Sequence, residues 1–274
     1  SFIGAGVYKS SDDGLHWKSS NIGLPTSKDV IDIVTIDSFL VAGTENGIYT
    51  FTEARNNWIP SNSGLPVDSR IISLSVCKGY IFASTPHGLF RSQDYAKSWI
   101  LINSSLISAT LCTNDTNIVA GNDSSLYISS NYGKDWVAIT PYPKGLTALT
   151  SDSKYIFSSY IIYPHFEEGI GIFRSSDGGK SWIMSNNGLP ASIFGVIVYT
   201  LAIHDSVVFV GTDDGIYLSK NYGDTWSRMI SGIPIPFDGM YNVGFLNAVS
   251  TSNGGCNFFA DTKDGLYRLS NKDS

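Results

Sequence analysis

The sequence has few charged residues, few cysteines and no long apolar run. Charged residues make up 15% of the 274 residues, and 18 Lys and Arg face 24 Asp and Glu, for a net charge of −6. Phosphate contacts dominate the affinity of nucleic-acid binders, and no cluster of Lys and Arg occurs here, so we expect no nucleic-acid partner. The longest apolar run, 193–203, is shorter than the roughly 20 residues that span a bilayer, so we expect no membrane insertion.

The cysteines are too few and too widely spaced for a disulfide framework or a zinc site. Cys77, Cys112 and Cys256 form no C-x-x-C pair, and we expect buried free thiols. A disulfide between Cys77 and Cys112 is the alternative, since both end the same strand in neighbouring repeats. The sequence also lacks a calcium-type D-x-D-x-D-G run and a phosphate loop. We therefore expect no metal and no cofactor.

A repeat of about 40 residues runs through the whole chain. Six tryptophans recur at intervals of 37 to 46 residues, and each has an aromatic residue nine positions upstream. A seventh aromatic, Tyr267, has no tryptophan after it. The clearest unit, 198–231, reads as four short strands separated by turn residues. Such units every 40 to 45 residues are typical of the blades of a β-propeller, and no segment has a helical period.

The repeats predict one all-β domain over 1–274, a β-propeller of four-stranded antiparallel blades. The first repeat lacks its inner strand and the last lacks its outer strand, so seven blades with two incomplete is the preferred prediction and six blades is the alternative. Closure removes exposed strand edges, so we expect some pairing of the two ends. The predicted repeats span 1–25, 26–66, 67–105, 106–143, 144–190, 191–234 and 235–274.

A turn with the pattern S-x-D/N-x-G-x-S/T-W, with at most one departure, precedes five of the six tryptophans. The intact copy is Ser175–Trp182, and the copy before Trp58 is degenerate. We expect the Ser and Asp side chains to cap N–H groups inside the turn, and the Trp to fill the space between sheets. The residues assigned this structural role are Ser10, Asp12, Gly14, Trp17, Asp94, Trp99, Asn131, Trp136, Asp177, Gly179, Trp182, Asn221, Gly223 and Trp226.

This turn resembles the Asp-box, or BNR repeat, and the resemblance covers essentially the whole chain. Similar repeats occur in bacterial sialidases, xyloglucan-cleaving glycoside hydrolases, sortilin-type receptors and photosystem II assembly factors. The sequence looks most like secreted bacterial proteins with tandem repeats, because S-N-x-G-L-P stands at 20–25, 61–66 and 185–190. The resemblance implies an extracellular or cell-surface location, with the periplasm as an alternative. It is specific for the fold and not for the function.

Three insertions into the repeat mark the candidate binding site. They lie at 160–169, 191–198 and 234–244, and we expect them on the face opposite the Asp-box turns, on consecutive blades. Aromatic rings flanked by carboxylates suit a sugar or the hot spot of a protein partner. The alternative is that these loops pack on one another and on a further domain. The candidate residues are Tyr160, Tyr163, His165, Phe166, Glu167, Glu168, Phe194, Phe237, Asp238 and Tyr241.

A second candidate place is the inner strand of each repeat, where small or polar residues recur. They are Asp32, Ser73, Ser108, Thr147 and Thr200, and they would fit either a water-lined channel or tight packing near the axis.

The preferred prediction of function is a non-catalytic module that binds a glycan or a protein, within a parent chain that can hold other domains. The alternative is a carbohydrate-active enzyme or a fragment of one. A glycosidase needs two carboxylates flanking one bond, and nothing in the sequence fixes the geometry of such a pair.

Overall fold

The structure, a computed structural model, describes residues 6–12, 14–27, 29–114, 117–140, 145–160, 171–190, 197–229, 243–250, 256–262 and 265–270. Side chains are described up to Met229. Contacts group the chain into two compact units. Unit 1 holds residues 1, 123–125 and 139–274, and unit 2 holds 2–122 and 126–138. The prediction of a single domain stays a prediction.

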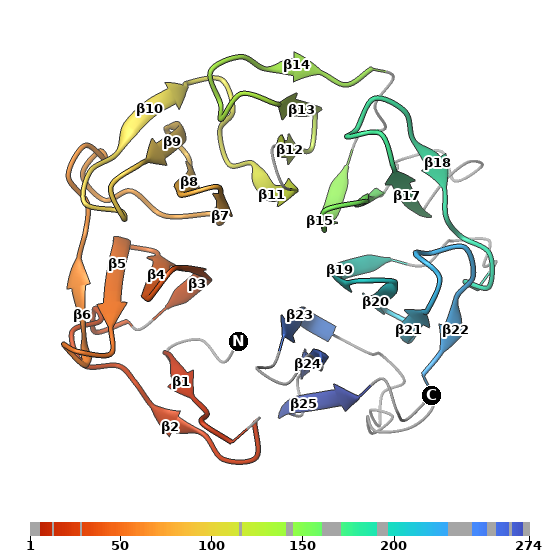
Figure 1. Cartoon of the computed structure of the whole chain (residues 1–274), viewed down its shortest axis with the longest axis horizontal. Helices are drawn as coiled ribbons and strands as arrows, with labels where there is room; N and C mark the ends of the chain where they lie inside the picture. The colour runs from red at the N-terminus through yellow and green to blue at the C-terminus, as the bar shows by residue number, and fades with distance from the viewer. Residues whose placement is uncertain are drawn as a thin grey trace. The chain divides into compact units, whose positions relative to one another are not determined.

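All regular structure in the described residues is β-strand, and consecutive strands pair antiparallel into seven sheets (Figure 1). Five sheets have four strands, the first has two and the last has three. The predicted all-β class and the four-stranded antiparallel repeat are therefore confirmed. The first and last sheets are the incomplete ones, as predicted, although the number of blades stays a prediction.

The sheets of unit 2 follow the chain in order. They are β1 (Tyr8–Lys9) and β2 (Lys18–Ser19); β3 (Val30–Ile36), β4 (Phe39–Thr44), β5 (Gly47–Thr52) and β6 (Asn57–Pro60); β7 (Ser73–Cys77), β8 (Tyr80–Thr85), β9 (Gly88–Ser92) and β10 (Ile100–Asn103); and β11 (Thr110–Asn114), β12 (Asn117–Asn122), β13 (Ser125–Ser129) and β14 (Val137–Ala138).

The sheets of unit 1 repeat the same order. They are β15 (Leu146–Ser151), β16 (Ile156–Tyr160), β17 (Gly171–Ser175) and β18 (Ile183–Met184); β19 (Val198–His204), β20 (Val207–Thr212), β21 (Gly215–Ser219) and β22 (Ser227–Arg228); and β23 (Val243–Ser250), β24 (Cys256–Thr262) and β25 (Gly265–Ser270).

The second strand of each complete sheet is deeply buried, because other strands flank it and both of its faces are covered. β8, for example, reads YIFAST, and five of its six residues are buried. Such strands carry a continuous apolar run instead of an alternating one. The cores form between successive sheets of one unit. Ile81 and Trp99 pack with Ile48 of the preceding sheet, and Val210 and Trp226 pack with Phe157.

Three of the six repeat tryptophans fill the space between sheets, as predicted. Trp58, Trp99 and Trp226 are 2%, 3% and 5% exposed. In contrast, Trp17 is 41% exposed, and Trp136 and Trp182 are half-buried. The packing role predicted for all six therefore holds fully for only half of them.

The difference follows from the S-N-x-G-L-P turn, which stands in the preceding repeat of each buried tryptophan. The indole N–H of Trp58, Trp99 and Trp226 donates to the carbonyl of the turn's serine, at 2.8, 2.9 and 2.7 Å. The backbone N–H of each Trp donates to the residue before the turn's glycine, at 2.8 Å in all three cases. The indoles of Trp17, Trp136 and Trp182 donate instead to a glycine carbonyl of their own turn.

Each part of the S-N-x-G-L-P turn has a structural task. In the copy at 61–66, Asn62 accepts the N–H of Ile48 at the start of its own third strand, and the Ser61 hydroxyl donates to the Ala96 carbonyl of the next sheet. Gly64 has φ +90°, the conformation required at the third position of a type II turn. A Cβ at Gly64 would lie 2.1 Å from the Trp99 carbonyl oxygen. The motif therefore binds one blade to the next.

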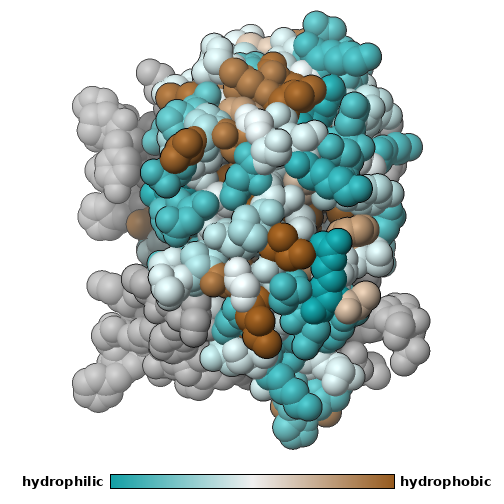
Figure 2. Space-filling model, turned by 90° about the vertical axis from the view of Figure 1, so that its left-hand side faces the viewer, coloured by the Kyte–Doolittle hydropathy of each residue, from teal (hydrophilic) through white to brown (hydrophobic). Residues whose placement is uncertain are grey.

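The surface drawn in Figure 2 carries its apolar residues as separate patches among polar ones. Single exposed apolar residues are normal on a protein surface and mark no site by themselves. The described residues contain no long apolar helix of the kind that crosses a bilayer. Cys77 and Cys112 are both buried, as predicted, and no disulfide joins them, so the disulfide alternative is wrong.

Candidate functional site

The predicted binding residues fall mostly outside the described part of the chain. Only Tyr160 is described, and its side chain is 2% exposed and packs edge-on against Phe173 with ring centroids 5.7 Å apart. Tyr160 is thus a core residue at the end of β16 and presents no surface to a ligand. The residues that lie outside the described ranges are Tyr163, His165, Phe166, Glu167, Glu168, Phe194, Phe237, Asp238 and Tyr241. Their role in binding stays a prediction.

Tyr160 stands where other sheets have a two-residue turn between their second and third strands. In three other sheets the second and third strands are joined by a two-residue turn, and a threonine hydroxyl donates to a glycine carbonyl across it. The pairs are Thr44 with Gly47 at 2.9 Å, Thr85 with Gly88 at 3.0 Å, and Thr212 with Gly215 at 2.7 Å. Tyr160 pairs with Gly171 in the same register, but residues 161–170 stand between them.

The three insertions enter at the same end of the strands in unit 1. One follows β16, one precedes β19, and one separates β22 from β23. The start of each first strand lies beside the end of its second strand, as in the pairs Leu146 with Tyr160 and Val198 with Thr212. We call this end of the unit 1 sheets the long-loop face.

The turn between β20 and β21 is the best described part of the long-loop face. The Asp213 carboxylate accepts the N–H of Ile197 at 3.0 Å, and Asp213 N–H donates to the Ile197 carbonyl at 3.1 Å. The Asp214 carboxylate accepts the Tyr217 hydroxyl, and the Asp214 carbonyl accepts an Arg228 N–H at 2.6 Å. Burial first, and then the hydrogen bond to Asp214, raise the pKa of Tyr217. This turn therefore fixes the residues where two of the insertions join the sheet.

Tyr199 is an exposed aromatic residue on the same face, and sequence reasoning did not select it. Its side chain is 39% exposed at the start of β19, beside the Asp213-Asp214 turn. Burial, followed by the charge of Asp213, raises the pKa of Tyr199. The only available sequence signal was a tyrosine at the start of an inner strand, which looked like ordinary alternation.

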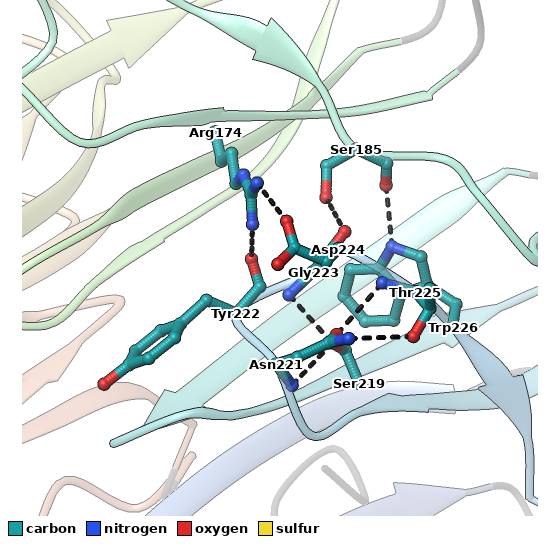
Figure 3. Close-up of polar contacts among 9 residues, drawn as sticks. All are labelled: Arg174, Ser185, Ser219, Asn221, Tyr222, Gly223, Asp224, Thr225 and Trp226. Carbon is teal, nitrogen blue, oxygen red and sulfur yellow. Dashed lines mark hydrogen bonds and ion pairs between the residues drawn. The ribbon is translucent and has the colours of Figure 1, made fainter.

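The carboxylates of the turns that resemble the Asp-box, labelled Asp-box turns for that resemblance alone, are used inside those turns. Asp177 accepts N–H groups of Lys180 and Ser181 at 2.9 Å and the Ser175 and Ser181 hydroxyls at 2.8 and 2.6 Å. Burial alone would raise the pKa of Asp177, but these hydrogen bonds lower it to about 2. A carboxylate this acidic stays ionised near neutral pH and cannot serve as a general acid. Asn221 replaces it in the turn of Figure 3. Its amide oxygen accepts the Thr225 N–H at 3.0 Å, and its amide nitrogen donates to the Thr225 hydroxyl at 3.0 Å.

The Asp-box face also carries the contacts between successive sheets. Arg174 donates to the Tyr222 carbonyl and to the Asp224 carboxylate of the next turn (Figure 3). The ring of Tyr222 points away from these bonds and packs on Tyr155, with centroids 4.7 Å apart. Arg91 binds the Tyr132 carbonyl at 2.6 Å in the equivalent position of unit 2. These arginines therefore join blades and do not converge on a substrate carboxylate.

The inner-strand register differs from the predicted one in two of its five members. By pairing, the equivalent positions are Asp32, Ser73, Thr110, Ala148 and Thr200. Thr147 lies in a β-bulge, which shifts the count by one residue. Ser108 lies before its strand, with φ +51°. The channel interpretation therefore rests on fewer polar residues than predicted.

Asp32 is the one carboxylate at this inner-strand register, and it joins two sheets. It accepts the Leu74 N–H at 2.7 Å, and burial raises its pKa, although hydrogen bonds partly offset the shift. Within the described residues no group of three or more His, Cys, Asp or Glu side chains could hold a metal ion.

Comparisons with solved structures identify the fold. The chain is similar to the GH74 xyloglucanase of Xanthomonas campestris, with a TM-score of 0.74 and 15% identity over 97% of this chain and 49% of that one. It is also similar to the extracellular domain of the one component system BT4673 from B. thetaiotaomicron, with a TM-score of 0.68 and 16% identity over 97% and 36% of the two chains. These structures are β-propellers. The chain has the β-propeller fold.

The propeller spans about half or less of the length of those two proteins. A third structure, YCF48 bound to D1 peptide, has a TM-score of 0.53 and 17% identity, and the match covers 91% of this chain and 95% of that one. Comparison with protein-family models finds no match, and comparison with curated sequences finds no relative. At these identities the similarity establishes the propeller fold alone, and the function has to be inferred from the residues of this chain.

Proposed function

We propose that the chain is a non-catalytic binding module of an extracellular or cell-surface protein, and that it binds a glycan or a protein on the long-loop face. One observation carries the proposal. The two-residue turn that closes other sheets is replaced by ten residues after Tyr160, and two more insertions join the same end of neighbouring sheets. Binding residues are commonly found on loops that a rigid scaffold positions.

The scaffold under these insertions is rigid for identifiable reasons. Ile197, near the end of the second insertion, and Arg228, the last residue of β22 before the third, are both bonded to the Asp213-Asp214 turn. Trp226 ties the same sheet to the preceding one. A loop that varies in length on such a base can change its ligand without disturbing the core.

The alternative is a carbohydrate-active enzyme or a fragment of one, and the likeness to the xyloglucanase favours it. Paired carboxylates for that chemistry would come from Glu167, Glu168 and Asp238. Against it, the described carboxylates of Asp12, Asp94 and Asp177 are all consumed by their own turns.

An extracellular location is supported by one of the similar structures, which is an extracellular domain. The chain covers 36% of that protein and 49% of the xyloglucanase, so further domains in a parent chain fit the same proposal.

A combined screen tests the proposal. The chain is applied to an array of polysaccharides and extracellular-matrix proteins, and the same polysaccharides are assayed for release of reducing ends. We expect binding without hydrolysis. The double variant Phe166→Ser/Phe237→Ser should weaken binding by more than about 2 kcal/mol, the scale of interface hot spots.

Ile183→Ser is the matched control, because this apolar side chain is 57% exposed on the outer strand β18. It should bind as the wild type does. Hydrolysis by the wild-type chain would favour the enzyme alternative, and equal binding by both variants would remove the long-loop face from the proposal.

A further inference from the structure

Tyr199 is the exposed residue of an otherwise buried strand. The other residues of β19 are buried or half-buried, whereas Tyr199 is 39% exposed. The pairing of β19 with β20 passes from Val198 with Thr212 directly to Thr200 with Gly211, so Tyr199 stands in a β-bulge with no paired residue. A bulge of this kind re-aims a side chain away from the regular face of a sheet.

The bulge belongs to the repeat, but the aromatic residue does not. Equivalent bulges in β3 and β15 carry Ile31 and Thr147. Thr147 is engaged with the Ser159 hydroxyl at 2.7 Å, and Ile31 is half-buried. A small or aliphatic side chain therefore satisfies the fold at this position. The exposed ring of Tyr199 needs a reason other than packing.

A carboxylate is fixed beside the backbone that leads into Tyr199, because Asp213 follows Thr212, the pairing partner of Val198. Asp213 exchanges two hydrogen bonds with Ile197, two residues before Tyr199, and its charge acts on the Tyr199 phenol. Only one oxygen of the Asp213 carboxylate has a hydrogen bond among the described residues. Asp214 is engaged with Tyr217 and Arg228, which holds the turn in place.

A tyrosine ring beside a fixed carboxylate matches the chemistry of a neutral sugar. The ring offers an apolar face for the C–H groups of a pyranose, and the carboxylate accepts strong hydrogen bonds from hydroxyl groups. Asp214 is paired with Arg228, but Asp213 forms no ion pair among the described residues, and its charge repels an anionic ligand. The centres of protein interfaces are depleted of charged residues, so this pair fits a sugar better than a protein.

We propose that Tyr199 and Asp213 form a subsite for a neutral glycan on the long-loop face. The proposal rests on the proposed binding function and narrows its ligand to one class.

The test measures binding of the whole chain to soluble xyloglucan, mixed-linkage β-glucan and galactomannan, by affinity electrophoresis and calorimetry, with polygalacturonate as the anionic comparison. We expect at least one neutral polymer to bind and polygalacturonate not to bind. Tyr199→Ala should raise the Kd by about tenfold or more. Tyr199→Phe keeps the ring, and its Kd should stay within about threefold of the wild-type value. Asp213→Asn should lose affinity several-fold.

Tyr95→Ala is the matched control. Tyr95 is 40% exposed and also lies beside a carboxylate, Asp37, but it stands on an Asp-box turn. Its variant should bind as the wild type does. The melting temperature of each variant is recorded, and Tyr199→Phe and Asp213→Asn keep the test valid if Tyr199→Ala does not fold.

The outcomes separate this proposal from the broader one. Glycan binding that Tyr199→Ala and Asp213→Asn leave unchanged would overturn the subsite alone. A wild-type chain that binds a protein and no neutral glycan would overturn the subsite and leave the binding function standing. A chain that binds neither glycans nor proteins would overturn both.

Discussion

The clearest test of the fold is the difference between two tryptophans that occupy the same position of adjacent repeats. Trp226 is 5% exposed and packs with Phe157 and Val210, and its indole donates to the Ser185 carbonyl at 2.7 Å. Trp182 is half-buried and donates to the carbonyl of Gly179 in its own turn. The two residues are equivalent in the sequence pattern, but their contacts differ.

Trp226→Ala removes a large buried side chain and should lower the free energy of unfolding by about 3–5 kcal/mol. Trp226→Phe keeps most of the apolar contact but leaves the Ser185 carbonyl without its donor, which should cost about 1–3 kcal/mol. Trp182→Ala should cost roughly 1–2 kcal/mol, because its side chain is partly in water and its hydrogen bond is local.

Urea unfolding followed by circular dichroism would measure all three variants on the same chain. Ser185→Ala provides an internal check, because it deletes the hydroxyl that donates to Gly223 at 2.5 Å and keeps the carbonyl that Trp226 uses. Equal losses for Trp182→Ala and Trp226→Ala would show that the S-N-x-G-L-P turn does not stabilise the tryptophan that follows it, and the reasoning would be refuted.

Three further predictions concern single side chains. Gly64→Ala should cost roughly 1–3 kcal/mol more than Gly79→Ala, because both glycines have positive φ but only Gly64 would place a Cβ against the Trp99 carbonyl, and thermal unfolding would show the difference. Asp177 has its pKa lowered from 3.8 to about 2, so it stabilises the fold above pH 4, and this contribution is lost as the pH falls toward 2. In Asp177→Asn the melting temperature should therefore fall less steeply with pH across this range. Asp32 has a raised pKa, so the folded state binds its proton more tightly and stability should fall as the pH rises from 3.8 through the raised value; Asp32→Asn should abolish this dependence, and an unchanged profile would contradict it.

The repeat itself could be predicted from the sequence because its signals are local and occur many times. The nine residues from each aromatic residue to its Trp cover one outer hairpin. Pairs such as Tyr217 with Arg228 show the register that this spacing implies. Glycines at the strand junctions, such as Gly215, mark where each third strand begins. Such signals can be recognised without knowing which sheets pack against each other.

Contacts between repeats were harder to predict, although one signal was present. The S-N-x-G-L-P segments at 20–25, 61–66 and 185–190 read only as marks of a protein class, whereas each one determines how the next tryptophan is packed. The inner-strand register failed at Thr147 because a β-bulge adds one residue without any change in composition, and it failed at Ser108 because that residue precedes its strand. The exposure of Tyr199 depends on the same backbone feature and could not be read from its neighbours in sequence.

The turns at the two ends of the sheets differ in how many hydrogen bonds they make internally and to the next turn. This difference decides where function can evolve. An Asp-box turn uses the Ser175 and Asp177 side chains to bond its own backbone, and Arg174 then ties the next turn to it. An insertion there would break both sets of bonds. At the opposite end, the part of the two-residue turn shared by three sheets is one threonine hydroxyl, which donates to a glycine carbonyl and accepts one N–H, as Thr212 does with Gly215 and Asp214; each bond is worth about 1 kcal/mol. Replacing that threonine by Tyr160 releases the turn at small cost, so the long-loop face is where the propeller can accept new loops without losing the contacts that hold its blades together.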